Sequence, residues 1–153
     1  MITTSELTVE KSDSPNSWDI FLPVVPVPAS RPRMARKSGR VYYGKRYTEF
    51  RRDASSLLNA YEWPVEFPLD GMVAVAVTFY VPRPKTTKRK HPRGDVDNYF
   101  KTLDVLNEMA WWDDDQIVWA SMAKEFSDEA GIGLEVKQID SIPKTRKMSD
   151  MRF

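Results

Sequence analysis

Four stretches of the chain are rich in β-branched and aromatic residues, and this pattern predicts strands. Residues 72–81 give the strongest signal, and residues 18–25 predict a first strand that prolines close. Residues 116–126 and 132–139 predict two more, and the second of them alternates between apolar and polar positions. A short polar turn separates these last two stretches, so we expect them to form a β-hairpin.

Helical spacing of apolar residues appears in two places. The first helix is predicted from Thr48 to about Tyr61, with Thr48 as N-cap. The second is predicted over 98–110, with Asp97 as N-cap. Its buried stripe comprises Phe100, Leu103, Leu106 and Ala110. Strands and helices together predict an α+β fold: a single domain with a mixed β-sheet and two main helices.

The length of 153 residues fits one domain with a real core. We place that domain at 17–140, between a flexible leader at 1–16 and a flexible tail at 141–153. The chain has no apolar run long enough to span a membrane and begins without a secretory signal pattern, which favours a cytoplasmic protein. Zero cysteines and one histidine exclude disulfides, thiolate zinc sites and multi-histidine metal centres.

The net charge of +1 hides a separation of charge along the chain. Basic residues concentrate in two segments rich in proline and glycine, at 31–52 and 83–93, while acidic residues concentrate at 95–115 and 125–140. Lysines and arginines on such loops suit contacts to nucleic-acid phosphates, although solvated loops have the same composition. The candidate DNA-binding residues are Arg31, Arg33, Arg36, Lys37, Arg40, Lys85, Lys88, Arg89, Lys90 and Arg93.

An acidic pair follows the second basic segment directly. Asp95 and Asp97 are two apart, so in extended backbone both carboxylates can face one cation. Lys101 lies one helical turn after Asp97, on a predicted polar face that continues through Asp104 and Glu108. A lysine there could neutralise charge on a phosphoryl oxygen. We therefore expect metal-assisted cleavage of a phosphodiester.

A second acidic group, Asp113-Asp114-Asp115, stands at the far end of the predicted helix. It can approach the first pair only if the following strand runs back alongside. Each acidic group also has a plain structural interpretation, as a helix cap or a polar turn. The combination argues against that interpretation, because clustered carboxylates repel one another unless a cation or basic partner is near. Trp111 and Trp112, just before this group, suit core or interface packing better than base stacking.

These residues resemble the RusA-type Holliday junction resolvases of bacteria and their phages. The resemblance rests on Asp-x-Asp-Asn-x-x-Lys at 95–101, Leu-Asp-x-Leu-Asn at 103–107 and Asp-Asp-x-Gln-Ile at 113–117. Upstream, Arg31-Pro32-Arg33 and the Pro-Arg-Pro-Lys segment at 82–85 are similar to further family segments. Between Lys101 and Asp104 the chain is one residue shorter than the family pattern.

The resemblance implies a homodimeric endonuclease, dependent on Mg²⁺ with Mn²⁺ as the alternative, that nicks four-way DNA junctions symmetrically in recombination and repair. By motif position Asp95, Asp97, Lys101 and Asp114 are the catalytic residues, and Asp95, Asp97, Asp114 and Asp113 the metal ligands. The shortened segment leaves the third ligand open among Asp113, Asp114 and Asp115, and the alignment favours Asp114. The implied location is the cytoplasm of a bacterial or phage-infected cell.

Two rival functions remain open at this stage. One is a nuclease of the same fold that acts on other branched or flapped DNA. The other is a non-catalytic DNA-binding or scaffold protein, in which the carboxylates only cap helices.

Overall fold

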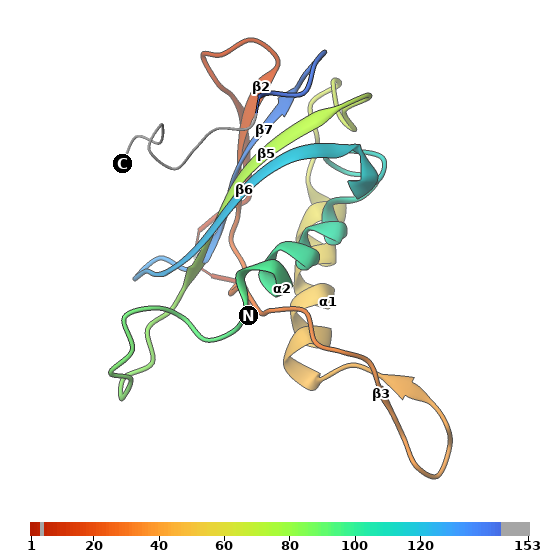
Figure 1. Cartoon of the computed structure of the whole chain (residues 1–153), viewed down its shortest axis with the longest axis vertical. Helices are drawn as coiled ribbons and strands as arrows, with labels where there is room; N and C mark the ends of the chain where they lie inside the picture. The colour runs from red at the N-terminus through yellow and green to blue at the C-terminus, as the bar shows by residue number, and fades with distance from the viewer. Residues whose placement is uncertain (4, 145–153) are drawn as a thin grey trace.

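A five-stranded sheet forms the body of the protein, as the computed structural model shows for residues 1–3 and 5–144 (Figure 1). Its strands lie in the order β1-β2-β7-β5-β6. They comprise β1 (Thr8–Lys11), β2 (Ser17–Leu22), β5 (Val73–Val81), β6 (Ile117–Phe126) and β7 (Gly131–Gln138). Only β5 and β6 run parallel to each other, and the other pairs are antiparallel. The predicted α+β fold with a mixed sheet is confirmed.

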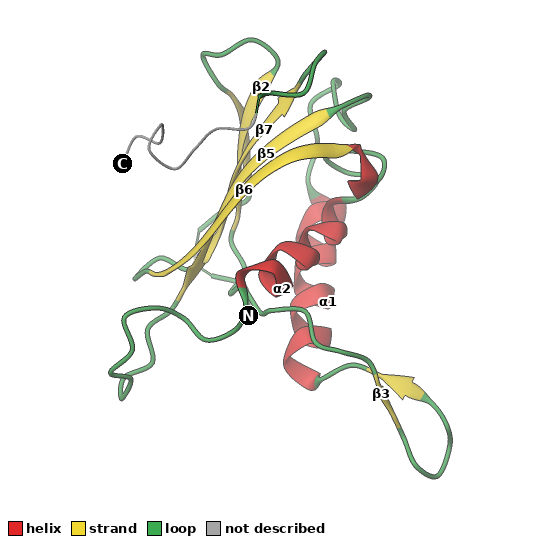
Figure 2. Ribbon diagram, in the orientation of Figure 1, coloured by secondary structure: helices red, strands yellow, loops and turns green. Residues whose placement is uncertain are grey.

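Two helices, α1 (Lys45–Ala60) and α2 (Val96–Phe100), lie on the same side of the sheet (Figure 2). Two 3₁₀ helices accompany them: η1 (Lys101–Leu106), which continues α2, and η2 (Asp114–Gln116), which leads into β6. A separate two-stranded arm, β3 (Arg33–Met34) with β4 (Val41–Tyr42), projects away from the body. None of the helices in the described residues is long and apolar enough to cross a membrane.

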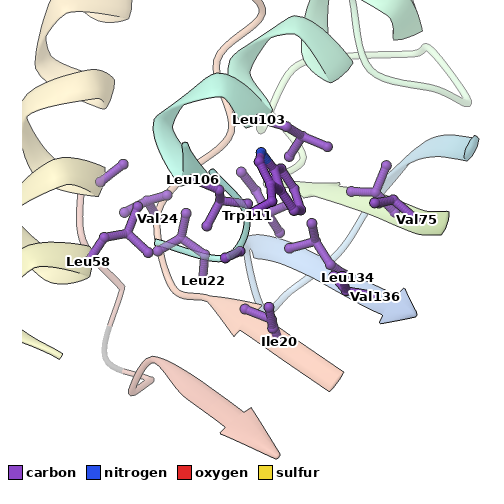
Figure 3. Close-up of a cluster of buried hydrophobic side chains, with 14 of the residues drawn as sticks. Ile20, Leu22, Val24, Leu58, Val75, Leu103, Leu106, Trp111, Leu134 and Val136 are labelled. Atoms are coloured by element: carbon purple, nitrogen blue, oxygen red, sulfur yellow. The ribbon is translucent and has the colours of Figure 1, made fainter. Parts of the chain in front are cut away.

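The core lies between the sheet and the helices (Figure 3). Strand β5 shows how the sequence directs this: Val73, Val75, Val77 and Phe79 are buried, while the intervening residues point to the other face. From the helical side, Leu103, Leu106 and Trp111 fill the same space. Trp111 is completely buried, whereas Trp112 is 55% exposed, so the core interpretation holds for the first of the two indoles.

The predicted hairpin between 116–126 and 132–139 is wrong. Both strands form, but β5 lies between them in the sheet, pairing in parallel with β6 and antiparallel with β7. The turn after β6 therefore passes over the end of β5, where the Ser127 N–H donates to the Val81 carbonyl. Neighbours in sequence are often neighbours in a sheet, but here β7 gains two partners, β2 and β5, as a central strand.

The predicted helix at 98–110 is also different in the structure. It begins at Val96 with Asp95, not Asp97, at the N-cap, and it tightens into the 3₁₀ helix η1 from Lys101 to Leu106. Glu108 adopts a positive φ of 68° in the turn that follows, so regular helix cannot continue to Ala110. Helix α1 likewise begins earlier than predicted, at Lys45, with Gly44 rather than Thr48 at the N-cap.

The predicted flexible leader contains part of the sheet. Residues Thr8–Lys11 form β1 and pair with β2, with Val9 opposite Ile20 and both buried. The polar residues around this short strand concealed it, because only Leu7 and Val9 contribute apolar surface. Of the predicted tail, residues 145–153 lie outside the described part of the chain.

Candidate active site

All the candidate catalytic residues lie in one crossover, the segment that connects β5 to the parallel strand β6. Asp95 and Asp97 stand at the start of α2, and Lys101 follows at the junction of α2 with η1. Asp113 and Asp114 stand at the start of η2, immediately before β6. Because β6 runs parallel to β5 and contacts α2, the chain folds back alongside the crossover, as the sequence analysis required.

The acidic pair at the start of α2 is exposed and is not used for capping. Asp95 is the N-cap residue, yet no side-chain hydrogen bond caps this helix. The backbone carbonyl of Asp95 accepts from the N–H groups of Asn98 and Tyr99 at 3.0 and 3.3 Å. Asp97 is in the first turn, with its side chain 65% exposed. The structural interpretation of these two carboxylates as caps therefore fails.

Lys101 connects the two acidic groups. Its Nζ lies 3.9 Å from Asp97 Oδ2 and 3.3 Å from Asn98 Oδ1, so it faces the acidic pair. Lys101 and Asp114 also line one pocket of about 310 Å³. Side chains of β6, including Ile117 and Trp119, form the rest of its wall. Lys101 thus contacts one acidic group and shares a pocket with Asp114 of the other.

The second acidic group begins with a genuine cap. Asp113 accepts a hydrogen bond from the Asp115 backbone N–H at 3.0 Å and forms a capping box with Gln116. That backbone hydrogen bond, followed by the hydrogen bond to Asp114, lowers the pKa of the Asp113 carboxyl. The cap interpretation is correct for Asp113.

Asp114 shows the opposite behaviour. Burial raises the pKa of its carboxyl, and the hydrogen bond and charge of Asp113 and the charge of Asp104 raise it further. A hydrogen bond from the Asn107 side chain acts against these effects. A nearby positive charge would therefore favour the ionised form of Asp114.

The 3₁₀ geometry of η1 decides which residues share a face. With three residues per turn, Lys101, Asp104 and Asn107 line up, and Glu108 falls outside the helix. The carboxylate of Asp104 is held from α1, where Arg51 Nη1 donates to Asp104 Oδ1 at 2.7 Å and to Tyr47 Oη at 3.1 Å. Asp104 thus supports the site from one side and adds negative charge near Asp114.

Sequence reasoning gave no role to two amides that position the acidic turn. Asn107 accepts from Trp111 Nε1 at 2.8 Å while its side chain reaches Asp114, which joins the site to the core. Gln116 Oε1 accepts from the N–H groups of Trp112 and Asp113. Gln116 Nε2 donates to the carbonyls of Leu69 and Gly71 at 2.8 and 3.0 Å. Both amides stand in the quoted motifs, Leu-Asp-x-Leu-Asn and Asp-Asp-x-Gln, which were the available signal.

The described residues do not bring three acidic or histidine side chains to one point at which they could hold a cation. They present two carboxylate groups with Lys101 between them. The chemistry of the donors suits a hard divalent cation, because every candidate ligand is a carboxylate oxygen. The mutual repulsion around Asp114 is of the kind that a cation relieves. The metal site itself stays a prediction.

The candidate DNA-binding residues form two separate exposed regions. Five of them lie on or beside the arm of β3 and β4, which projects at the lower right of Figure 1: Arg31, Arg33, Arg36, Lys37 and Arg40. The other five lie in the loop of residues 82–94, at the lower left of the same view: Lys85, Lys88, Arg89, Lys90 and Arg93. The second loop ends at Gly94, immediately before Asp95, so it leads directly into the acidic pair.

Comparison with known proteins agrees with this arrangement. The sequence model of the family Endodeoxyribonuclease RusA matches residues 23–137, which include every candidate catalytic residue. The uncharacterized protein YqaN of Bacillus subtilis (strain 168) is 27% identical over 132 residues, in an alignment that covers 76% of this chain and 92% of YqaN. The chain therefore belongs to the RusA endodeoxyribonuclease family, and this membership implies endodeoxyribonuclease activity.

Proposed function

We propose that this chain is a Mg²⁺-dependent endonuclease that resolves four-way DNA junctions by paired symmetric nicks, in DNA recombination and repair. The observation that carries the proposal is the position of Lys101, which faces Asp97 at 3.9 Å and lines a pocket together with Asp114. A helix cap or a polar turn does not require a lysine that contacts one acidic group and shares a pocket with another. Membership in a family of DNA-cutting enzymes supports the same conclusion.

In this proposal Asp95, Asp97 and Asp114 hold the cation, with Asp113 beside them. Mg²⁺ or Mn²⁺, when bound there, supplies an activated water and positive charge for the leaving oxygen. The chain contributes the remaining functions. Lys101 places an ammonium group beside the phosphate to be cut. Asn107 and Gln116 hold the acidic turn in place.

The proposed paired nicks also have a consequence for the oligomeric state of the protein. Two strands related by a two-fold axis are cut symmetrically when two active sites share that axis, which a homodimer provides. The homodimer and a cytoplasmic location in a bacterial or phage-infected cell are both parts of the proposal.

The deciding experiment compares cleavage of synthetic four-way, forked and linear DNA, with Mg²⁺ and with EDTA. We expect cleavage of the four-way junction only with Mg²⁺, and its loss in Asp97→Asn. Preference for forked or flapped DNA would favour the rival nuclease, and preference for linear duplex would overturn junction resolution. A wild-type cleavage rate in Asp97→Asn would show that the proposed metal site is wrong. Glu135→Gln, an exposed carboxylate on β7, is the matched control and should keep the wild-type rate.

A further inference from the structure

A second pocket lies on the other side of Gly94 from the acidic pair. It measures about 400 Å³, a size typical of sites that hold a small ligand. Four arginines line it: Arg46 from α1, and Arg83, Arg89 and Arg93 from the loop of residues 82–94. No acidic residue of the described chain is among the lining residues. Four arginines around one space without a carboxylate favour an anion there.

The loop around this pocket is fixed by side chains that donate to its backbone carbonyls. Arg83 Nη1 donates to the Arg89 carbonyl at 3.0 Å while its guanidinium stacks on Phe126 at 4.4 Å. Tyr99 Oη donates to the Arg93 carbonyl at 2.8 Å. Lys124 Nζ, from β6, donates to the carbonyls of Pro92 and Gly94. The loop is therefore organised before any ligand arrives, which lowers the entropy lost on binding.

The close packing at Gly94 fixes the pocket next to the acidic pair. Gly94 has a φ of 93°, and an added Cβ would lie 3.1 Å from Pro28 and 3.2 Å from Tyr99. Both neighbours line the pocket. Glycine is thus required by its backbone conformation and by the close approach of these side chains. The next residue is Asp95, so the pocket and the acidic pair are joined by one rigid turn.

Two of the four arginines have no other task within the described residues. Arg46 and Arg93 make no side-chain hydrogen bond and no salt bridge there, whereas Arg83 holds the loop and Arg89 Nε lies 3.5 Å from the His91 carbonyl. Arg46 belongs to the first basic segment but was not among the candidate DNA-binding residues, and it lies in a helix far along the chain from the loop. Arg46 and the arginines of the loop line one pocket only in the folded chain.

We propose that this arginine pocket binds a phosphate group of the substrate strand other than the one that is cut, with Arg46 and Arg93 as its ligands. The proposal rests on the proposed function, since it takes DNA as the source of the phosphate. A free phosphate compound carries the same chemistry, and the experiment separates the two sources. Holding a second phosphate beside the acidic pair fixes the register of the strand relative to the cation site.

The test uses four-way junctions in which one phosphate at a time, near the branch point, is replaced by an uncharged methylphosphonate. Binding is measured in EDTA, so that no cleavage is needed. For wild type we expect a roughly tenfold loss of affinity at one particular position. In Arg46→Gln and in Arg93→Gln we expect the unmodified junction to bind roughly tenfold more weakly, with little further loss at that position.

The matched control is Arg52→Gln, an arginine of the same helix that is 71% exposed and lies 3.6 Å from Asp53. It should retain the full loss at the sensitive phosphate. Unchanged thermal unfolding of all three variants checks that each folds. In Arg46→Gln and Arg93→Gln, the loss of affinity from the arginine substitution and the loss from each replaced phosphate could simply add at every position. That result would overturn the proposal.

A second arm titrates inorganic pyrophosphate into wild type and Arg93→Gln by calorimetry. Binding to wild type that Arg93→Gln abolishes, without coupling to any DNA phosphate, would assign the pocket to a free phosphate compound and overturn its role on DNA. Failure of the proposed function would look different. The link between the arginine variants and one replaced phosphate can also be measured on linear duplex. That measurement tests the pocket even if four-way junctions are not the preferred substrate.

Discussion

The two acidic groups of the crossover look alike in sequence but are built differently. Each places aspartates at the start of a short helix, at 95–97 and at 113–115. Asp113 caps its helix and takes part in a capping box, whereas Asp95 and Asp97 cap nothing with their side chains. The comparison shows that an aspartate before a helix is not always its cap, and that the Asp95 and Asp97 side chains are not engaged in capping. It also separates Asp113, whose side chain caps the following helix, from Asp114, whose side chain does not.

The largest effect that tests this contrast is expected at Asp114. Asp114→Asn should lower junction cleavage by about 100-fold or more, because the proposed cation loses a charged ligand. Folding should be unaffected or slightly improved, since the substitution removes repulsion by Asp113 and Asp104. Cleavage rates with Mg²⁺ and thermal unfolding measure both effects.

Asp115→Asn is the control in the same turn. Its backbone N–H, not its side chain, supports the cap, so its cleavage rate should stay close to wild type. If Asp115→Asn were the inactive variant instead, the assignment of the third ligand would move by one residue.

The next largest effect is expected at Lys101. Lys101→Met should lower the cleavage rate by about 100-fold, because one positive group beside the reacting phosphate is lost. Binding of the junction in EDTA should change much less, since Lys101 is proposed to act on the phosphate in the transition state. Lys137→Met on β7 is the control. Equal losses of binding and of cleavage would make Lys101 a phosphate anchor only.

A smaller effect should follow when the acidic turn loses its attachment. Gln116→Leu removes four hydrogen bonds, two within the turn and two to the carbonyls of Leu69 and Gly71. We expect a loss of about 1–3 kcal/mol in the free energy of unfolding and a lower cleavage rate, because Asp114 is no longer held in position.

Gln138→Leu is the matched control, because Gln138 makes a single hydrogen bond to the same loop, at the Asp70 carbonyl. It should destabilise less and leave cleavage unchanged. Equal cleavage rates in the two variants would show that the attachment of the turn matters for stability alone.

The smallest expected effect tests the difference in capping between Asp113 and Asp95. Asp113→Ala should lower the midpoint of thermal unfolding by roughly 2–4 °C, because the N-cap hydrogen bond is lost. Asp95→Ala should leave the midpoint unchanged, since the Asp95 side chain makes no cap. Calorimetric or fluorescence melting curves in EDTA compare the two. A larger drop for Asp95→Ala would mean that its carboxylate is structural after all.

The sequence predicted those features that depend on neighbours along the chain. The strand predicted at 72–81 and the helix predicted from Thr48 to about Tyr61 both form, as β5 and α1, because β-branched content and helical spacing are local signals. The candidate catalytic motif was visible because its residues are close in sequence. The return of β6 alongside the crossover, which the sequence analysis required, brings Asp114 into one pocket with Lys101.

What the sequence did not reveal depends on contacts made only in the folded chain. Strand β5 enters between β6 and β7 because it offers hydrogen-bonding edges to both, which no local pattern records. The change from α to 3₁₀ geometry at Lys101 aligns Asn107 with Asp104 in place of Glu108. Arg46 reaches the arginine pocket from another element.

The crossover between two parallel strands has one more consequence. Both acidic groups, the lysine and the amides that position them occupy residues 95–116 without interruption, while their supports at Arg51 and Leu69 come from outside. Insertions elsewhere in the chain therefore leave the spacing of the reactive groups intact, but any insertion inside this stretch alters it.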